Sequence, residues 1–152
     1  MNNTNIEAFT IIGIAVRTTN ENGQSAKDIE ALWNKFMSEG ILDKIPNKID
    51  NTIYSVYTEY EGDYTQPYTT ILGCKVESLD DIPNGMVGKS FRGGKYVKTT
   101  AKGDLMKGLI VNHWSKIFEM DLERNYIVDF EVFGEKAQNP SNAEVDFYVG
   151  VK

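Results

Sequence analysis

Glu131 is the residue of this sequence whose type and setting best suit chemistry. It lies in the run DFEVF, inside a β-rich stretch over residues 127–133. Because side chains alternate along a strand, Glu131 shares one face with Asp129 and Phe133, and the other face is apolar. A carboxylate buried without a partner costs several kcal/mol, so it either stays protonated or waits for a cation. The pattern predicts a group at Glu131 that binds a cation or accepts a proton.

Aromatic residues are expected around this carboxylate. In the last predicted strand, residues 144–151, every second side chain is apolar, and that apolar set should pack under the helices. Tyr148 alternates with this set, so we expect it on the face of Glu131 and Phe133, with open space beside it at Gly150. Aromatic rings attract flat or quaternary cations by roughly 0.5–2 kcal/mol per good contact. These residue types indicate a site for lipophilic cations.

Two copies of one unit run through the sequence, and comparing them singles out the same glutamate. Trp33 and Trp114 each lie 20 residues after the first glycine of a similar run. The paired runs are GIAVRTT (13–19) with GKYVKTT (94–100), YSVY (54–57) with FEVF (130–133), and ILGCK (71–75) with YVGVK (148–152). Ser55 is therefore the counterpart of Glu131. Positions that the copies share are candidates for structure, and this unshared carboxylate is a candidate for function.

The elements that must position these residues follow the same duplicated order. Alternating and β-rich runs predict strands, and apolar residues at helical spacing predict two amphipathic helices. The expected strands span residues 9–17, 53–60, 68–76, 95–100, 127–133 and 144–151, and the expected helices span residues 25–40 and 104–120. We predict an α+β fold of duplicated β-α-β-β units with pseudo-two-fold symmetry. Its sheet is mainly antiparallel, with both helices on one face.

The chain is expected to form a single domain with a pocket at the seam between the copies. Repeat one covers about residues 8–76, a Gly- and Asp-rich linker covers 77–93, and repeat two covers 94–152. The two tryptophans lie on helix stripes and are expected to pack in the core. The predicted ligand-binding residues are Glu131, Tyr148, Phe133, Tyr57, Tyr96, Ser55 and Ile71.

Composition excludes several classes of function. The formal charge of the 152-residue chain is −6, with 16 basic residues scattered among 22 acidic ones, so direct nucleic-acid binding is not expected. One Cys and one His do not suffice for the usual zinc site, and no phosphate-binding motif is present, so no metal or cofactor is expected. No segment has the length of a membrane span or the pattern of a signal peptide. We expect a cytoplasmic protein without membrane contact.

The chain resembles the GyrI-like family, the effector-binding domains of AraC- and MerR-type multidrug regulators. The matching pieces are GGKYVKTT, the helix that carries Trp114, DFEVF and the terminal AEVDFYVGVK. The resemblance covers nearly the whole chain and implies a pocket for hydrophobic, often cationic compounds around a central glutamate. By that match, Glu131 is the glutamate, and Phe133 and Tyr148 are wall residues. Family members often carry proline where this chain has Gly150.

The resemblance leaves three functions open. The first is a stand-alone effector-binding domain, because the chain begins directly with the first strand and shows no helix-turn-helix; its partner would be a small molecule and a separate transcription regulator. The second is a hydrolase of reactive electrophiles with Glu131 as general base. The third is a gyrase-inhibitor-like protein that binds gyrase through its acidic surface.

Overall fold

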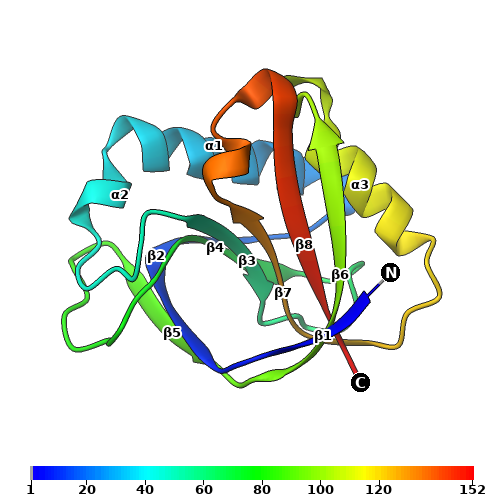
Figure 1. Cartoon of the computed structure of the whole chain (residues 1–152), viewed down its shortest axis with the longest axis horizontal. Coiled ribbons are helices and arrows are strands. Elements are labelled where there is room, and N and C mark those ends of the chain that lie inside the picture. The colour runs from blue at the N-terminus through cyan, green and yellow to red at the C-terminus, as the bar shows by residue number, and fades with distance from the viewer. Residues whose placement is uncertain (1) are drawn as a thin grey trace.

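The computed structural model describes residues 2–152, which form one curled antiparallel sheet and a layer of helices (Figure 1). The strands are β1 (Asn2–Ile6), β2 (Phe9–Thr18), β3 (Ile53–Thr58), β4 (Tyr68–Lys75), β5 (Val87–Phe91), β6 (Gly94–Gly103), β7 (Arg124–Phe133) and β8 (Ala143–Val151). The helices are α1 (Gln24–Ser38), α2 (Ile41–Lys44) and α3 (Leu109–Phe118). Short 3-10 turns span Glu21–Gly23, Leu105–Lys107, Glu135–Ala137 and Pro140–Asn142. Within residues 2–152, no helix combines the length and the apolar character that crossing a membrane requires.

The strand order of the sheet reflects the duplication of the sequence. The eight strands follow the order β1-β6-β8-β7-β3-β4-β2-β5. Exchanging β1 with β5, β2 with β6, β3 with β7 and β4 with β8 reverses this order, so a pseudo-two-fold axis passes between β3 and β7. The predicted fold class, with duplicated units and a mainly antiparallel sheet, is confirmed.

Each unit contains one strand more than the sequence predicted. β5 lies inside residues 77–93, which were expected to be a linker, and β1 precedes the first predicted strand. β1 pairs with β6 and β5 pairs with β2, so each extra strand completes the sheet of the other unit. Both strands are short edge strands with few apolar residues, so they lack the hydrophobic alternation that identifies a strand.

The second helix is shorter than predicted. Residues 104–120 were expected to be helical, but Leu105–Lys107 form a 3-10 turn and α3 begins only after Gly108. Gly108 adopts a left-handed φ of 76°, which glycine accommodates without the steric cost that a Cβ atom brings. This break separates the 3-10 turn from the helix that packs on the sheet.

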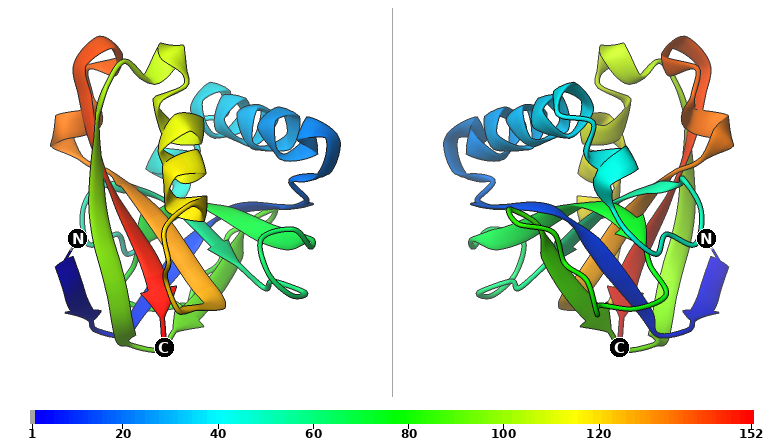
Figure 2. Two further views of the ribbon diagram at one scale, coloured as in Figure 1. Left: turned by 90° about the vertical axis from the view of Figure 1, so that its right-hand side faces the viewer. Right: turned by 90° about the vertical axis from the view of Figure 1, so that its left-hand side faces the viewer.

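Both faces of the sheet are buried. Figure 2 shows α1 and α3 on one side of the sheet, where α1 packs on β2 and β4 and α3 packs on β6. On the other side the sheet curls around its own apolar cluster, whose buried members are Phe9, Ile11, Val56, Ile71, Phe91, Tyr96, Val128 and Phe130. An apolar strand face can therefore point toward the helices or away from them.

The glycines of the paired runs have different surroundings, which yields a first prediction. A Cβ atom on Gly13 would lie 2.1 Å from the carbonyl oxygen of Leu72, whereas one on Gly94 would have no neighbour within 4 Å. We expect Gly13→Ala to lower the free energy of unfolding by about 3 kcal/mol or more, because backbone atoms cannot yield. Gly94→Ala should change it by less than about 1 kcal/mol. Urea unfolding of both variants measures this, and equal losses would contradict the packing of β2 against β4.

Candidate functional site

Glu131 lies on the pseudo-two-fold axis. It lies near the C-terminal end of β7 and pairs in register with Ser55 of β3, its counterpart in the other repeat. Both residues are buried, and Glu131 is only 1% exposed. Two glutamates at these positions would place like charges directly opposite each other in a buried site, which is unfavourable. The axis therefore has room for one carboxylate, which explains why the match between the copies is broken here.

Two hydrogen bonds hold the Glu131 carboxylate, and both end on the same oxygen. The Tyr57 hydroxyl donates to Oε2 over 2.7 Å, and the Trp114 indole Nε1 donates to it over 2.5 Å. Ser55 in turn donates to the Tyr57 hydroxyl over 3.4 Å. Within residues 2–152, Oε1 receives no hydrogen bond and no ion pair includes Glu131. One oxygen of a buried carboxylate is thus left for another partner.

The protonation of Glu131 follows from this environment. Burial raises the pKa of the carboxyl from 4.5 to about 7, and the bonds from Trp114 and Tyr57 lower it in part. Burial, together with the nearby Glu131, also raises the pKa of Tyr57 well above its usual value, so Tyr57 stays a donor. Near neutral pH, Glu131 is therefore divided between its neutral and charged forms.

Two tryptophans reach across the seam between the repeats. Trp33 of α1 packs edge-on against Phe133 of β7 with ring centroids 4.9 Å apart, and Trp114 of α3 packs edge-on against Tyr57 with centroids 5.5 Å apart. Each tryptophan thus contacts the strand of the other repeat. Trp114 was expected to pack in the core with a ring edge able to reach the pocket, and in the structure it is a hydrogen-bond donor to Glu131. Its position, 20 residues after Gly94, indicated that Trp114 has a counterpart in Trp33. Nothing in the sequence indicated that its indole N–H would bind Glu131.

The predicted ligand-binding residues divide between the two faces of the sheet. Ser55, Tyr57, Phe133 and Glu131 lie together on the helix side. Tyr148, Tyr96 and Ile71 were expected on the same face, and for these three that placement is wrong.

These three residues belong to the apolar cluster on the other side of the sheet. Tyr148 stacks on Phe130 at 4.8 Å, Tyr96 packs against the same ring at 5.5 Å, and Ile71 lies in the same cluster. The error arose because the apolar face of β7 was assigned to the helices. It points instead into the curl of the sheet, so Asp129, Glu131 and Phe133 face the helices.

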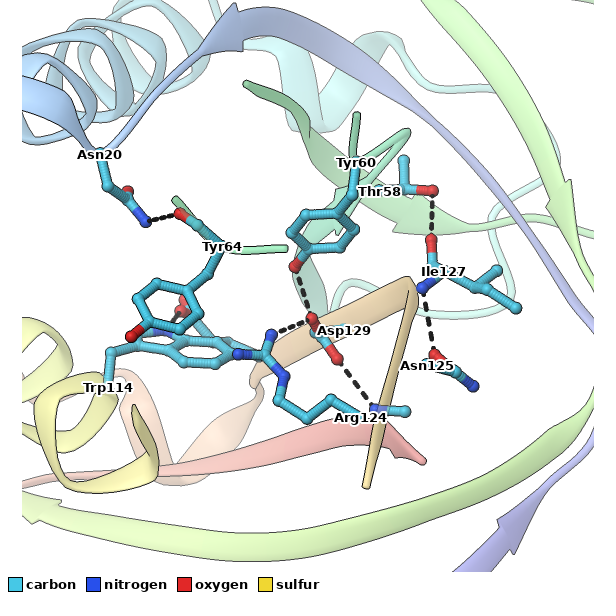
Figure 3. A network of polar contacts seen from close by, with 11 residues as sticks. Asn20, Thr58, Tyr60, Tyr64, Trp114, Arg124, Asn125, Ile127 and Asp129 are labelled. Atoms are coloured by element: carbon cyan, nitrogen blue, oxygen red, sulfur yellow. Dashed lines mark hydrogen bonds and ion pairs between the residues drawn. The ribbon is translucent and has the colours of Figure 1, made fainter. Parts of the chain in front are cut away.

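A second buried acid, Asp129, lies two residues before Glu131, and no role was predicted for it. Asp129 accepts hydrogen bonds from Arg124 Nη2 over 2.7 Å, from the Tyr60 hydroxyl over 2.5 Å and from the Gly150 amide over 2.8 Å (Figure 3). Asp129 shares the strand face of Glu131, which was the available signal. Its cationic partner, Arg124, could not be predicted from the sequence, because the contact between them depends on an irregular stretch of β7.

That irregular stretch is a bulge between Arg124 and Asp129, where the pairing of β7 with β8 shifts register. Tyr126 within it has a left-handed φ of 53°, which is uncommon for a residue with a side chain. Gly150 was expected to leave open space, but a Cβ atom there would lie 2.7 Å from the Val128 carbonyl oxygen. Gly150 therefore permits close packing of the bulge, and its amide binds Asp129.

A loop covers the end of the site near Asp129. Tyr64, in the connection between β3 and β4, stacks on Phe118 of α3 with ring centroids 4.2 Å apart. The Asn20 side chain donates to the Tyr64 carbonyl over 2.9 Å and accepts from the Tyr68 hydroxyl over 2.6 Å. The centre of the Tyr64 ring also lies 6.0 Å from the guanidinium carbon of Arg124. The carboxylate of Glu131 is thus closed off by side chains.

An open hollow of about 520 Å³ lies elsewhere, between the β5–β6 connection, the end of β3 and the bulge of β7. Its lining includes neither Glu131 nor Trp114. Because hydrogen bonding, burial and a shifted pKa converge on Glu131, we take the glutamate, and not the hollow, as the candidate site. Within residues 2–152, no group of three or more His, Cys, Asp or Glu side chains is placed to hold a metal ion.

The structure is thus an α+β domain of two similar units with a buried carboxylate at the seam between them. The family model described as Cass2, integron-associated effector binding protein, matches residues 4–151. The chain therefore belongs to the Cass2 family of effector-binding proteins. The resemblance to effector-binding domains that the sequence indicated is confirmed.

Individual relatives agree with this membership. YobU of Bacillus subtilis (strain 168), named as a proposed transcriptional regulator, is 24% identical over 153 residues, covering 98% of this chain and 96% of YobU. The integron cassette protein VCH_CASS2 from the mobile metagenome of Vibrio cholerae has a TM-score of 0.76 and 28% identity, covering 99% of this chain and 95% of that one. SAV2435, solved with bound tetraphenylphosphonium, has a TM-score of 0.75 and 14% identity, covering 99% and 93%. At that identity, the likeness to SAV2435 concerns the fold alone.

The raised pKa of Glu131 gives a prediction for stability. Because the folded pKa of about 7 exceeds the usual 4.5, the folded state binds more protons between these pH values, and the free energy of unfolding falls as pH rises through them. Glu131→Gln keeps an oxygen that accepts from Tyr57 and Trp114 but cannot ionise. We expect it to gain stability relative to the wild type from pH 5 to pH 8, on the order of 3 kcal/mol.

Urea unfolding at several pH values measures this difference. The matched control is Glu135→Gln, which removes an exposed carboxylate of the same charge. It should follow the wild-type pH dependence. A Glu131→Gln curve parallel to the wild type would mean that Glu131 is not held in a desolvated state.

Proposed function

We propose that this chain binds lipophilic cations at Glu131, in the seam between the two repeats. The observation that carries the proposal is a fully buried carboxylate that has one free oxygen, no cationic partner among residues 2–152, and aromatic rings on both sides. A cation at Oε1 would compensate the charge that burial disfavours. The bound tetraphenylphosphonium of SAV2435 supports this class of ligand.

The surrounding side chains favour a ligand with a delocalised charge. Trp114 and Tyr57 offer ring faces and edges next to the carboxylate, and Trp33 with Phe133 continues the aromatic wall along β7. Ring faces attract cations without demanding a fixed hydrogen-bond geometry. For strongly hydrated ions such as sodium, the free energy lost on desolvation would exceed the free energy gained from contacts in this site. Binding requires movement of the side chains that close the site, and the Tyr64–Phe118 stack is the part most readily displaced.

We also propose that the occupied domain acts in transcriptional regulation. Membership of an effector-binding family and the name given to YobU support this role. A ligand that separates Tyr64 from Phe118 would alter the surface formed by α3 and the β3–β4 loop, which a partner protein could detect.

A direct test is calorimetric titration of tetraphenylphosphonium into the protein. We expect saturable binding by the wild type, and at least a tenfold weaker affinity for Glu131→Gln, because the neutral amide cannot compensate the cation. Glu135→Gln, which changes the net charge equally, should bind as the wild type does. Equal affinities for the wild type and Glu131→Gln would remove the electrostatic role, and lack of binding by the wild type would remove the proposal.

The pH dependence of binding gives a separate prediction. The cation needs ionised Glu131, so affinity should rise by about tenfold between pH 6 and pH 8 as a carboxyl with a pKa of about 7 loses its proton. Below the pKa, binding should release a proton to the buffer. Titration at pH 6 in two buffers of different ionisation enthalpy measures that release. Affinity that is independent of pH would contradict the assignment.

One observation also favours a hydrolytic role. A carboxylate with a pKa near 7 beside the Tyr57 hydroxyl is suited to activate water as a general base. In that case an electrophilic substrate should be turned over, with a rate that rises through pH 7 and is lost in Glu131→Gln. Turnover that survives this substitution would exclude the mechanism.

A further inference from the structure

Arg124 is a buried cation whose hydrogen-bonding capacity is only partly used. Its side chain is 6% exposed and its Nη2 donates to Asp129. Nε and Nη1 are buried without a hydrogen-bond acceptor among residues 2–152. Leaving a buried donor unpaired costs about 1–3 kcal/mol, and native proteins leave few such groups. An acceptor that is not part of the chain would recover this energy.

Aromatic rings surround the same guanidinium. Its central carbon lies 4.4 Å from the ring centre of Tyr126, 5.9 Å from that of Trp114 and 6.0 Å from that of Tyr64. The rings attract the positive charge, but a ring face supplies no lone pair of the strength that a carbonyl oxygen does. The enclosure therefore stabilises the charge of Arg124 and leaves the N–H groups of Nε and Nη1 open to an oxygen ligand.

Arg124 belongs to the same site as Glu131. Trp114 donates to Glu131 through its indole nitrogen and contacts Arg124 through its ring. Figure 3 shows Trp114, Arg124 and Asp129 close to one another. Asp129 and Glu131 are alternate residues on one face of β7, so their Cα atoms lie about 7 Å apart. A single small molecule can reach both groups.

We propose that Arg124 is a second recognition point for the ligand of Glu131. Its free N–H groups bind an oxygen acceptor, such as a carbonyl or ester, on a lipophilic cation whose positive centre lies at Glu131. This inference rests on the proposed function and narrows it: the preferred ligands carry an oxygen acceptor in addition to the cationic centre. Cations without such an acceptor use Glu131 alone.

The broken symmetry of the sheet supports this assignment. Asp129 pairs with Tyr57 in the sheet, and the pseudo-two-fold axis relates this pair to that of Ile53 with Phe133. The apolar residue Ile53 therefore occupies the position equivalent to Asp129. The fold therefore does not require a charge there. The bridge of Arg124 to Val151 recurs in the first repeat as that of Lys48 to Val76, but Lys48 donates to the Leu42 carbonyl and to Asn51. Among the described residues, the buried ion pair therefore occurs only in the repeat that supplies Glu131.

Tyr64 controls access to Arg124. Its ring centre lies 6.0 Å from the guanidinium carbon, and Tyr64 is held by its stack on Phe118 and by the bond from Asn20. A ligand that displaces the Tyr64 ring would expose the guanidinium and the indole together. Charge on the guanidinium remains balanced by Asp129, so a cationic ligand meets no net repulsion at this end of the site.

The test uses two triphenylphosphonium probes with chains of equal length, one hexyl and one methyl butanoate, which differ in the ester group. We expect the wild type to bind the ester about tenfold more tightly, the equivalent of one good hydrogen bond to a charged donor. The variant is the double substitution Arg124→Met with Asp129→Asn, which removes both members of the buried pair and keeps an acceptor for the Gly150 amide. It should bind the two probes equally.

Each outcome separates this inference from the proposed function. Glu131→Gln should weaken both probes by the same factor and keep the preference for the ester. Equal wild-type affinity for the two probes, or a preference that persists in the double variant, would overturn the role of Arg124 and leave that of Glu131 standing. Failure of both probes to bind the wild type would overturn both.

A spectroscopic measurement on the wild type avoids any effect of substitution on folding. The Arg124 Nε–H resonance in a nitrogen–proton correlation spectrum should move downfield on saturation with the ester probe and move less with the hexyl probe. Identical shifts with both probes would contradict a hydrogen bond from Arg124.

Discussion

The structure depends on one constraint, the burial of a single carboxylate on the axis between two similar units. Glu131 and Ser55 face each other in register, and charge repulsion limits this position to one acid. The carboxylate then requires donors from both repeats, and it obtains them from Tyr57 of the first and Trp114 of the second. The same two rings pack against each other across the seam. The interaction that creates the candidate site therefore also joins the two halves of the sheet.

Two acids on one strand face show how the environment decides what a carboxylate can do. Asp129 meets Arg124, Tyr60 and an amide, so its charge is compensated inside the protein. Glu131 meets only neutral donors, and burial raises its pKa to about 7. A compensated charge stabilises a local arrangement, whereas an uncompensated one remains available for a ligand or a proton. The contrast between these neighbours is the strongest physical argument that the site lies at Glu131.

The fold explains why the site is closed by side chains and not by backbone. The axis strands β3 and β7 run between α1, which packs on β2 and β4, and α3, which packs on β6. Above the axis strands the cover consists of tryptophan side chains from the helices and of the β3–β4 loop with Tyr64. Side chains and a loop can move without disturbing the sheet. This arrangement suits a domain of the Cass2 family, whose members bind effectors.

The sequence by itself determined the duplicated α+β plan, three strands and one main helix of each unit, and the singular position of Glu131, because alternation and repetition are local properties of the chain. It also placed Ser55, Tyr57 and Phe133 correctly beside Glu131. Only the tertiary structure decided which strand face meets the helices, since the curled sheet buries apolar residues on both sides; Tyr148, Tyr96 and Ile71 lie on the far side for this reason. The partnership of Asp129 with Arg124 likewise depended on a bulge, whose geometry arises from pairing between β7 and β8 and leaves no local pattern in the sequence.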